Sequence, residues 1–299
     1  MPKTFTVDND YQDSRLDRWF KNNVIDIPHS LIEKIIRQNK VKVNKKKTKS
    51  SYRVQEGDII EVYEFSKFKP QKKDFTIKYK PKINELGKYS DYILEDNENF
   101  VIINKPAGIP VQSGTKSFKN LIDILKDTKY FKNEKPYVVH RIDKETSGIL
   151  IVAKNRKFAQ LFTSLFRIRK IHKTYIAITY GKIPNNIKIL KDDLIYYEKD
   201  KKIKLNAISY LKVLKSNALY SLIELKPITG RKHQLRKQLF NIGFPIIGDD
   251  KYFIRGNKAH KIKNLMLHSY KIKFIINNTK YNFKANYNYN FEKFLKKNL

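Results

Sequence analysis

The sequence predicts an α+β protein of two domains, the second built around a central, largely antiparallel mixed sheet. Between residues 91 and 299, short apolar runs typical of strands are interspersed with amphipathic helical patterns. They lack the regular strand–helix alternation of a parallel α/β fold. A polar, Lys-rich stretch at 67–90, with Pro70 and Pro81, is typical of a linker. The chain has 299 residues, of which 40% are hydrophobic, and this suffices for two cores.

The segment 14–66, ahead of the linker, has the pattern of a small helix–helix–strand module. Apolar side chains within 16–20 share one helical face. Ser30 and Glu33 form a capping-box pattern, which predicts that a second helix starts there. Residues 41–44 alternate as in a strand, and 59–62 follow a Gly-Asp turn as another strand.

The segment 91–299 predicts a second, larger α+β domain. Apolar periodicity predicts helices at 158–166 and 235–242, and Gly243 ends the second of them. Strand-like runs lie at 91–105 (around a turn), 149–153, 175–180 and 220–225.

The charge of the chain indicates a polyanionic partner. There are 63 Lys and Arg against 29 Asp and Glu, a formal net charge of +34. Such an excess favours nucleic acid or an anionic membrane surface. A drift in composition towards Lys, Asn, Ile and Tyr, as A+T-rich codons produce, could supply part of the lysine. It does not readily produce a twofold excess of bases over acids, so nucleic acid is favoured.

Several classes of site are excluded by what the sequence lacks. With no cysteine, disulfides, thiolate metal sites and cysteine nucleophiles are ruled out. There is no glycine-rich phosphate loop or dinucleotide fingerprint, and the histidines lack metal-ligand spacing. No apolar run approaches the roughly 20 residues of a membrane span, and the N-terminus lacks the apolar core of a signal peptide. We therefore expect a cytoplasmic, monomeric protein with no metal and no membrane partner.

The strongest candidate for chemistry lies in 140–148, His-Arg-Ile-Asp-Lys-Glu-Thr-Ser-Gly. Asp143 follows the cation of Arg141 and precedes a Thr-Ser-Gly turn and the apolar run 149–153. An acid at the edge of a sheet is well placed to react, because the sheet fixes its position. Taken alone, an Asp beside an Arg is more often a structural ion pair.

This stretch closely resembles the catalytic signature of the pseudouridine synthases, in the family that includes the ribosomal large subunit enzymes C and D. The family pattern is His-Arg-Leu-Asp, two variable residues, then Thr-Ser-Gly, and Ile142 stands here for Leu. Further family motifs follow in the family's order, and the run of motifs is nearest the C type. They lie at 104–108, 173–177, 229–236, 243–249 and 267–268. One departure is visible, because Lys237 and Gln238 stand where the family usually has an apolar residue and a His.

The segment 14–66 resembles the S4 RNA-binding module. The resemblance rests on Arg15-Leu16-Asp17, on the Val-Lys-Val-Asn strand at 41–44 and on the turn at Gly57-Asp58. It implies that basic side chains around the second helix contact RNA phosphates, which give affinity and orientation rather than base readout. The alternative is a solvated basic face. The residues concerned are Lys34, Arg37, Lys40 and Lys45.

The family resemblance also implies roles for residues of the second domain. Asp143 would act on the sugar of a uridine, as a nucleophile or by abstracting a proton. Arg236 would pair with it and keep it ionised, because a nearby cation opposes the effect of burial. Tyr175 would stack on the uracil. The reaction involves no redox change, so no cofactor is expected.

Other positions would bind the substrate. Arg141 would occupy the space that the extruded base leaves in an RNA helix, and Ile176 and Leu235 would form apolar walls. Lys173 would contact phosphate, although on so basic a chain it could be plain surface. His140 and His233 are expected to be structural.

The sequence therefore predicts an isomerase that converts uridine to pseudouridine in structured RNA, most simply 23S rRNA. Two alternatives stay open. A non-catalytic RNA-binding assembly factor could retain the fold, although it would be expected to lose one of Asp143, Tyr175 and Arg236. A glycoside hydrolase would need two suitably spaced carboxylates, for which Glu145 is the nearest partner of Asp143 in sequence.

Overall fold

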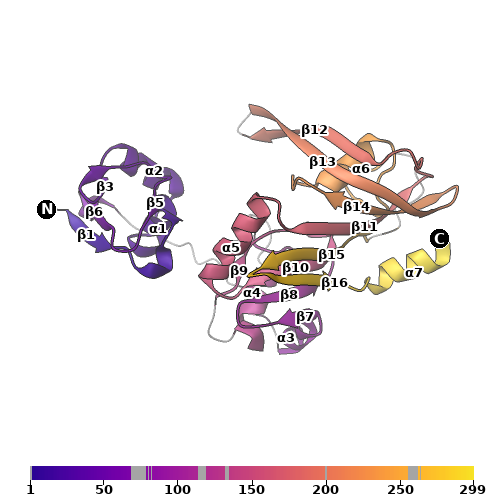
Figure 1. The fold of residues 1–299 in the computed structure, drawn as a ribbon, viewed down its shortest axis with the longest axis horizontal. Coiled ribbons are helices and arrows are strands. Elements are labelled where there is room, and N and C mark those ends of the chain that lie inside the picture. The colour runs from indigo at the N-terminus through magenta and orange to yellow at the C-terminus, as the bar shows by residue number, and fades with distance from the viewer. Residues whose placement is uncertain are drawn as a thin grey trace. The chain divides into compact units, whose positions relative to one another are not determined.

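The structure is a computed structural model that describes residues 2–68, 79, 81, 83–113, 119–131, 135–198, 201–254, 262 and 264–299. The chain divides into two compact units, Met1–Ile77 and Lys78–Leu299 (Figure 1). Within the predicted linker, 67–90, residues 69–78, 80 and 82 lie outside the described residues.

The first unit packs two helices against a four-stranded sheet of order β1-β6-β3-β4. Its core holds the apolar residues predicted on the first helix, with Leu16, Trp19 and Phe20 fully buried. β1 precedes the predicted module and pairs with β6, a long-range contact that no local pattern announces. The elements are β1 (Lys3–Thr6), η1 (Asn9–Tyr11), β2 (Ser14–Arg15), α1 (Leu16–Asn23), α2 (His29–Arg37), β3 (Val41–Val43), β4 (Lys46–Lys47), β5 (Arg53–Val54), β6 (Ile59–Val62) and η2 (Phe65–Lys67).

The predicted capping box on the second helix is wrong. α2 begins two residues earlier than the capping box implies, at His29, and Pro28 rather than Ser30 is its N-cap. Ser30 therefore lies inside the first turn, where it cannot cap, and no side chain caps the helix. Pro28 starts the helix instead, because its carbonyl accepts from the amides of Leu31 and Ile32 at 2.9 and 3.1 Å.

The second unit is built on a ten-stranded sheet with the order β12-β13-β14-β11-β15-β10-β8-β7, to which β16 and β9 are added at β15 and β10. Among the described strands only β10 and β15 pair in parallel, so the prediction of a mixed, largely antiparallel sheet is confirmed. The elements are α3 (Ile83–Ser90), β7 (Ile93–Asp96), β8 (Phe100–Lys105), α4 (Leu121–Lys126), η3 (Lys129–Phe131), β9 (Tyr137–Val138), β10 (Ser147–Ala153), α5 (Arg156–Arg167), β11 (His172–Tyr180), β12 (Ile189–Glu198), β13 (Lys201–Ser216), β14 (Tyr220–Pro227), α6 (Gln234–Asn241), β15 (Leu267–Ile276), β16 (Thr279–Lys284) and α7 (Tyr289–Asn298).

Residues 83–90, which the polar pattern assigned to the linker, form helix α3. Leu86 packs against the core of the second unit, and Tyr89 is buried in it, although Gly87 lies between them in sequence. Tertiary packing thus overrides the weak helix propensity of a glycine.

The central strand β10 is buried on both faces, as its continuous apolar run predicted. Leu150 and Val152 face one core, while Ile149 and Ile151 face the other, which Phe162 of α5 covers. At the start of β10, Gly148 has φ +105, and a Cβ there would lie 2.3 Å from the carbonyl oxygen of Ser269. Only glycine lets β10 approach β15 this closely, so the loop before β10 is fixed at the middle of the sheet.

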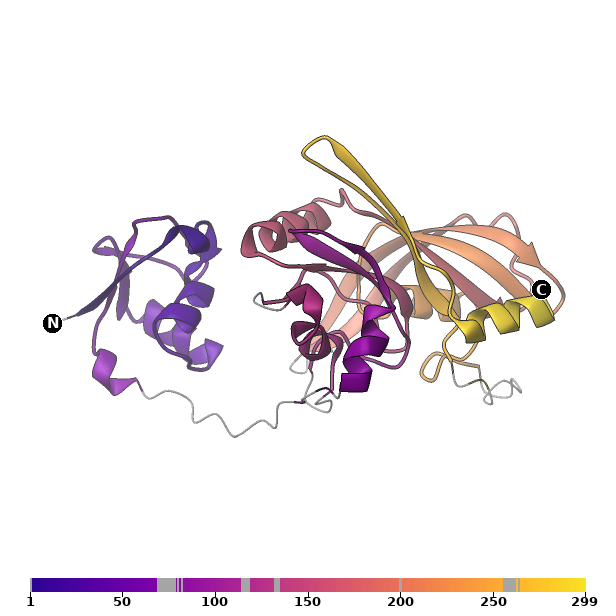
Figure 2. The ribbon, with the colours of Figure 1, turned by 90° about the horizontal axis from the view of Figure 1, so that it is seen from below.

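Figure 2 shows the sheet from below, with the β15–β16 hairpin extending beyond the neighbouring strands. Within the described segments, none of the helices combines the length and the apolarity that a membrane crossing needs.

Candidate active site

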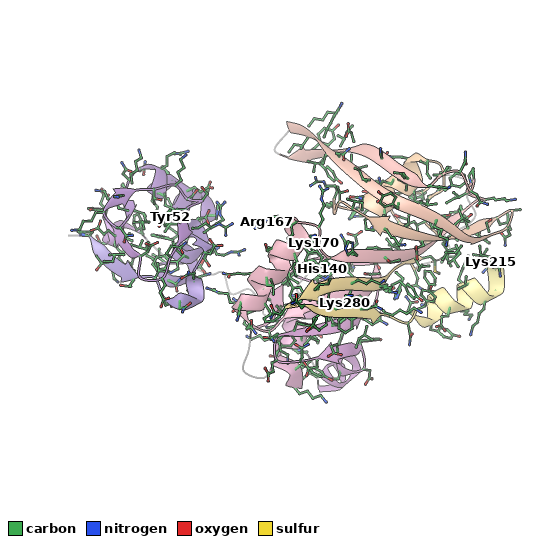
Figure 3. All side chains as sticks on the ribbon, in the orientation of Figure 1. Tyr52, His140, Arg167, Lys170, Lys215 and Lys280 are labelled. Atoms are coloured by element: carbon green, nitrogen blue, oxygen red, sulfur yellow. The ribbon has the colours of Figure 1, made fainter. Side chains whose placement is uncertain are left out.

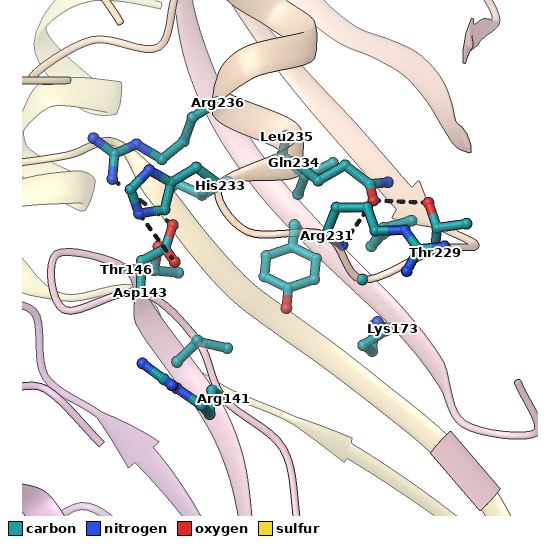
Figure 4. Close-up of a pocket in the computed structure, with 15 residues that line it drawn as sticks. Arg141, Asp143, Thr146, Lys173, Thr229, Arg231, His233, Gln234, Leu235 and Arg236 are labelled. Carbon is teal, nitrogen blue, oxygen red and sulfur yellow. Dashed lines mark hydrogen bonds and ion pairs between the residues drawn. The ribbon is translucent and has the colours of Figure 1, made fainter. Parts of the chain in front are cut away.

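Asp143 lies in the loop that leads into β10, at the mouth of a small pocket. Its side chain is 29% exposed. One carboxylate oxygen is 3.7 Å from Nη1 of Arg236, and the other is 3.8 Å from Nε2 of His233 (Figure 4). The backbone closes the loop, because the amide of Thr146 donates to the carbonyl of Asp143 at 3.1 Å. The carboxylate is thus partly open to solvent and held beside a cation.

Lys105 fastens this loop from beneath. Its side chain is fully buried, and Nζ donates to the carbonyls of Pro106, Ile109 and Lys144 at 2.8, 2.9 and 3.0 Å. Burial lowers the pKa of Lys105 to about 7. The lysine ties the turn after β8 to the residue that follows Asp143. The sequence motif at 104–108 contained this lysine but did not indicate its role.

Arg236 of α6 lies beside Asp143 as expected, but its hydrogen bonds go elsewhere. Nε and Nη2 donate to Asp249 at 2.7 and 2.6 Å, and Nη2 also donates to Asp250 at 2.9 Å. Burial acts to lower the pKa of Arg236, but the hydrogen bonds and charge of Asp249 outweigh it and raise the pKa. The cation expected to pair with Asp143 is therefore oriented by a second carboxylate, which is fully buried.

His233 takes the other side of Asp143. It has φ 54, in the left-handed region, at the N-cap of α6. Its Nδ1 hydrogen-bonds with the hydroxyl of Tyr252 at 3.0 Å. Burial lowers the pKa of His233, although the charge of Asp143 opposes this. His233 was expected to be structural, and sequence spacing did not indicate that it approaches Asp143.

The loop between β14 and α6 is braced by Gln234. Its Oε1 accepts from the hydroxyl of Thr229 at 2.7 Å and from the amide of Arg231 at 3.1 Å (Figure 4). Gln234 is buried. This bracing holds Arg231 and His233 at the pocket.

Tyr175 and Ile176 illustrate the alternation of a strand. Tyr175 lines the pocket and is 9% exposed. Burial raises the pKa of Tyr175 to about 12, so its hydroxyl is protonated at neutral pH. Successive side chains on a strand point to opposite faces, and Ile176 lines neither the pocket nor the adjoining groove. The prediction that Ile176 forms a wall of the site is therefore wrong.

The pocket has a volume of about 100 Å³ and brings together most of the predicted residues. This is well below the roughly 300–1,000 Å³ of a pocket that encloses a drug-sized ligand, so it suits one small ring. The predicted residues that line it are Arg141, Asp143, Lys173, Tyr175, Leu235 and Arg236.

A larger groove of about 1,260 Å³ adjoins the pocket and shares Arg141, Lys173 and Tyr175 with it. Its lining is strongly basic. Among the described residues that line it, Glu224 supplies the one carboxylate, which pairs with Lys226 at 2.9 Å. Arg167 reaches it from the end of α5, where Lys170 also lies (Figure 3). The cations that line the groove are Arg141, Arg167, Arg169, Lys173, Lys226, Arg231, Lys271 and Lys273.

Lys173 and Lys271 are the partly buried members of this set, whereas the other cations are exposed. Burial lowers the pKa of Lys173, and no described carboxylate acts to raise it. A desolvated ammonium without a counter-ion costs free energy, which an anionic ligand would recover.

In the first unit, the basic residues predicted to contact phosphate differ in exposure and in ion pairing. Lys34 and Arg37 are exposed on one face of α2, three residues apart. Lys45 is exposed in the turn between β3 and β4. Lys40 instead donates to Glu64 at 2.9 Å, so its charge is partly neutralised.

One cluster of possible metal ligands occurs among the described residues: Asp17, His29 and Glu33. Asp17 already accepts from Arg15 at 3.1 Å and from the amide of Arg18 at 2.7 Å. A guanidinium on this carboxylate already supplies the positive charge that a metal ion would bring.

Comparison with known proteins identifies the family. The profile described as RNA pseudouridylate synthase matches residues 99–241, and the S4 domain matches 15–60. Ribosomal large subunit pseudouridine synthase C of Rickettsia conorii (strain ATCC VR-613 / Malish 7) is 40% identical over 265 residues, covering 82% of this chain and 83% of that protein. The chain belongs to the RNA pseudouridine synthase family.

Other relatives agree with this assignment. The enzyme of the same name from Vibrio vulnificus (strain CMCP6) is 30% identical over 281 residues, covering 90% of this chain and 87% of that one. The solved structure of human RNA pseudouridylate synthase domain containing 4 superimposes with a TM-score of 0.59 at 27% identity, covering 71% of this chain and 95% of that one. This pseudouridine synthase is therefore an isomerase with an S4 RNA-binding domain, as predicted, and not a glycoside hydrolase.

The two residues that depart from the family pattern, Lys237 and Gln238, both make hydrogen bonds in this structure. Gln238 is fully buried and donates to the carbonyls of Leu190 and Ala207 at 3.2 and 3.1 Å. Lys237 donates to the carbonyl of Ile195 at 3.2 Å. Both side chains thus fasten α6 to the β12–β13 hairpin.

Proposed function

We propose that the protein converts specific uridines of structured RNA, in the 23S rRNA of the large ribosomal subunit, to pseudouridine, with Asp143 as the catalytic group. The observation that carries this proposal is the partly exposed carboxylate of Asp143 at a pocket that also holds Tyr175 and Arg236. The names of the relatives support the large subunit as the source of the substrate.

The reaction breaks the bond between N1 of uracil and C1′ of the ribose, turns the base, and joins C5 to C1′. The proton on C5 leaves, and N1 gains one, so no oxidant or cofactor is consumed. Asp143 acts on the sugar, as a nucleophile or by taking a proton from it. This chemistry uses the carboxylate form, and the guanidinium of Arg236 lies 3.7 Å from it.

The pocket holds the base while it turns. The ring of Tyr175 gives it a flat apolar surface, and the raised pKa keeps the hydroxyl available as a hydrogen-bond donor. Leu235 is buried at the wall of the pocket. Arg141 is exposed and lines both the pocket and the groove, which suits a side chain that fills the gap left by an extruded uridine.

RNA backbone contacts come from both units. In the catalytic domain (91–299, with α3 added to it), Lys173 contacts a phosphate from the groove. In the RNA-binding module (14–66), Lys34, Arg37 and Lys45 do so. Lys40 contributes less because it is paired with Glu64. The enzyme works in the cytoplasm as a monomer, without metal or cofactor.

The decisive experiment maps pseudouridines in rRNA from cells that lack the protein and from cells complemented with wild type or Asp143→Asn. Asn has nearly the same shape as Asp but cannot act as a carboxylate. We expect wild type to restore the missing pseudouridines and Asp143→Asn to restore none, while the purified variant still binds rRNA. Full restoration by Asp143→Asn would remove Asp143 from the mechanism. An unchanged pseudouridine map in the deletion strain would favour a non-catalytic assembly factor.

A further inference from the structure

One face of the β12–β13 hairpin carries exposed aromatic and apolar side chains between lysines. In the register of the two strands, Tyr197 lies opposite Lys202, and Ile195 lies opposite Lys204. Side chains directly opposite on antiparallel strands share a face. Tyr197 is 77% exposed and Ile195 is 40% exposed. Large exposed side chains gathered on one face are typical of an interaction site.

The same face continues to the groove of the catalytic site. Ile189 lies opposite Tyr210, and Tyr210 in turn lies opposite Lys226 of β14. Tyr210 and Lys226 both line the groove. The stretch from Lys202 to Tyr210 spans roughly 27 Å at about 3.4 Å per residue. We call this surface, defined by Ile189, Ile195, Tyr197, Lys202, Lys204 and Tyr210, the hairpin outer face.

The opposite face of the hairpin is fixed to the catalytic helix. Gln238 of α6 donates to carbonyls on both strands, those of Leu190 and Ala207. Lys237, its neighbour on α6, donates to the carbonyl of Ile195. These bonds hold the hairpin outer face at a set position relative to the helix that carries Arg236. A ligand bound to the hairpin outer face is therefore held at a fixed distance from the pocket.

Charge and side-chain type decide the occupant. Lysine is depleted at the centres of protein–protein interfaces, whereas lysine next to an exposed aromatic ring is the usual combination for unpaired nucleotides. The groove with which this face is continuous is itself basic. We propose that the hairpin outer face binds unpaired nucleotides of the same RNA that carries the target uridine. The tyrosine rings stack on bases, and the lysines contact phosphates. This inference rests on the proposed function and adds a second contact region to it.

The test compares hairpin variants with matched controls elsewhere on the same unit. Tyr197→Ala removes a ring that is 77% exposed, and Tyr289→Ala removes one on α7 that is 73% exposed. The double change Lys202→Gln with Lys204→Gln is matched by Lys296→Gln with Lys297→Gln, both exposed on α7. Affinity for a protein-free, unmodified 23S rRNA transcript is measured over a range of salt concentrations.

We expect Tyr197→Ala to weaken binding by about 5-fold or more, because one base stack is worth at least about 1 kcal/mol. Tyr197→Phe, which keeps the ring, should bind like wild type. The lysine pair should flatten the plot of log affinity against log salt by about 1.4, at about 0.7 per phosphate of a single strand. Both control variants should match wild type.

Three results would overturn the inference. The hairpin and control variants could bind equally well with equal salt slopes, or Tyr197→Phe could lose as much affinity as Tyr197→Ala. The third is weaker binding to assembled large subunits but not to protein-free rRNA, which would assign the face to a ribosomal protein. Tritium release from RNA labelled at C5 of uridine, measured with wild type in parallel, separates the two proposals. Its absence refutes the proposed function, whereas normal release with unaffected hairpin variants refutes only the second contact region.

Discussion

Asp249→Asn should reduce turnover by disturbing the aim of Arg236. The Asp249 side chain has no exposed surface. It accepts from Nε and Nη2 of Arg236 at 2.7 and 2.6 Å and from the amides of Lys251 and Tyr252, both at 2.9 Å. Asn keeps the shape but replaces one acceptor oxygen with a donor, which faces the donors of the guanidinium. Arg236, only 4% exposed, would lose its main counter-ion.

The size of the effect follows from this burial. Removing one partner of a buried ion pair costs about 3–5 kcal/mol. At roughly 2–4 °C per kcal/mol for a unit of this size, the melting temperature should fall by about 6–20 °C. The freed guanidinium no longer has a set distance from Asp143, and a displacement of about 1 Å at a catalytic site costs on the order of 100-fold in rate.

The assay is single-turnover tritium release at saturating protein, well below the lowered melting temperature. Asp250→Asn is the matched control, because Asp250 accepts from the same Nη2 at 2.9 Å but its side chain is 64% exposed. An exposed pair is worth about 1 kcal/mol or less, so this control should stay within a few-fold of the wild-type rate. A wild-type rate in Asp249→Asn, together with a lower melting temperature, would show that Asp249 serves the fold and not the aim of Arg236.

Three further predictions concern binding and pH. Removal of residues 1–66 should weaken rRNA binding and flatten its salt dependence by up to about one unit per phosphate contact, with little change in single-turnover rate at saturation; an unchanged slope would mean that this basic face is only solvated. Lys173→Met should weaken rRNA binding yet stabilise the free protein, since it removes a desolvated cation; lower stability in a thermal melt would contradict this. Burial, together with the charge of Lys173, lowers the pKa of His140 to about 3. In the unfolded chain the same ring has a pKa of about 6.5. Stability that depends on the neutral ring is therefore fully present above pH 6.5 and is lost as the pH falls towards 3. His140→Asn should therefore make unfolding free energy depend less steeply on pH between about 6 and 4, by about 1.4 kcal/mol per pH unit, and an unaltered steepness in urea titrations would contradict the assignment.

The apolar elements of the fold were predictable because their patterns are local. The run at 149–153 lies within β10, and the faces of α5 and α6 follow helical periodicity. β12 and β13 were not predicted. Their sequences are rich in charge, since only one face of the hairpin is covered, and their pairing is not encoded in a short window. β1 was not predicted for a related reason, because its partner β6 lies more than fifty residues away in the sequence.

The candidate site was predictable where a motif carried it and not where partners are distant in sequence. Asp143, Tyr175, Lys173, Leu235 and Arg236 do meet at one pocket. Of the two carboxylates beside Arg236, the sequence predicted Asp143 but not Asp249, which comes from the chain beyond α6. Gly248 has φ +75 just before it, and a Cβ there would lie 2.0 Å from the carbonyl oxygen of Asn264. That constraint places Asp249, but only the tertiary structure reveals it.

The net charge of +34 has two components that the structure separates. Lys296 and Lys297 are exposed on α7 and line neither the pocket nor the groove, as expected of lysine that accumulates by composition. Lys173 is different, because it is partly buried at the rim of the site and burial lowers its pKa. A solvated lysine costs the fold nothing and needs no ligand, whereas a desolvated one lowers stability until an anion reaches it. The cations that bind RNA are therefore better identified by the stability that their burial costs the free protein than by how many cations the chain has.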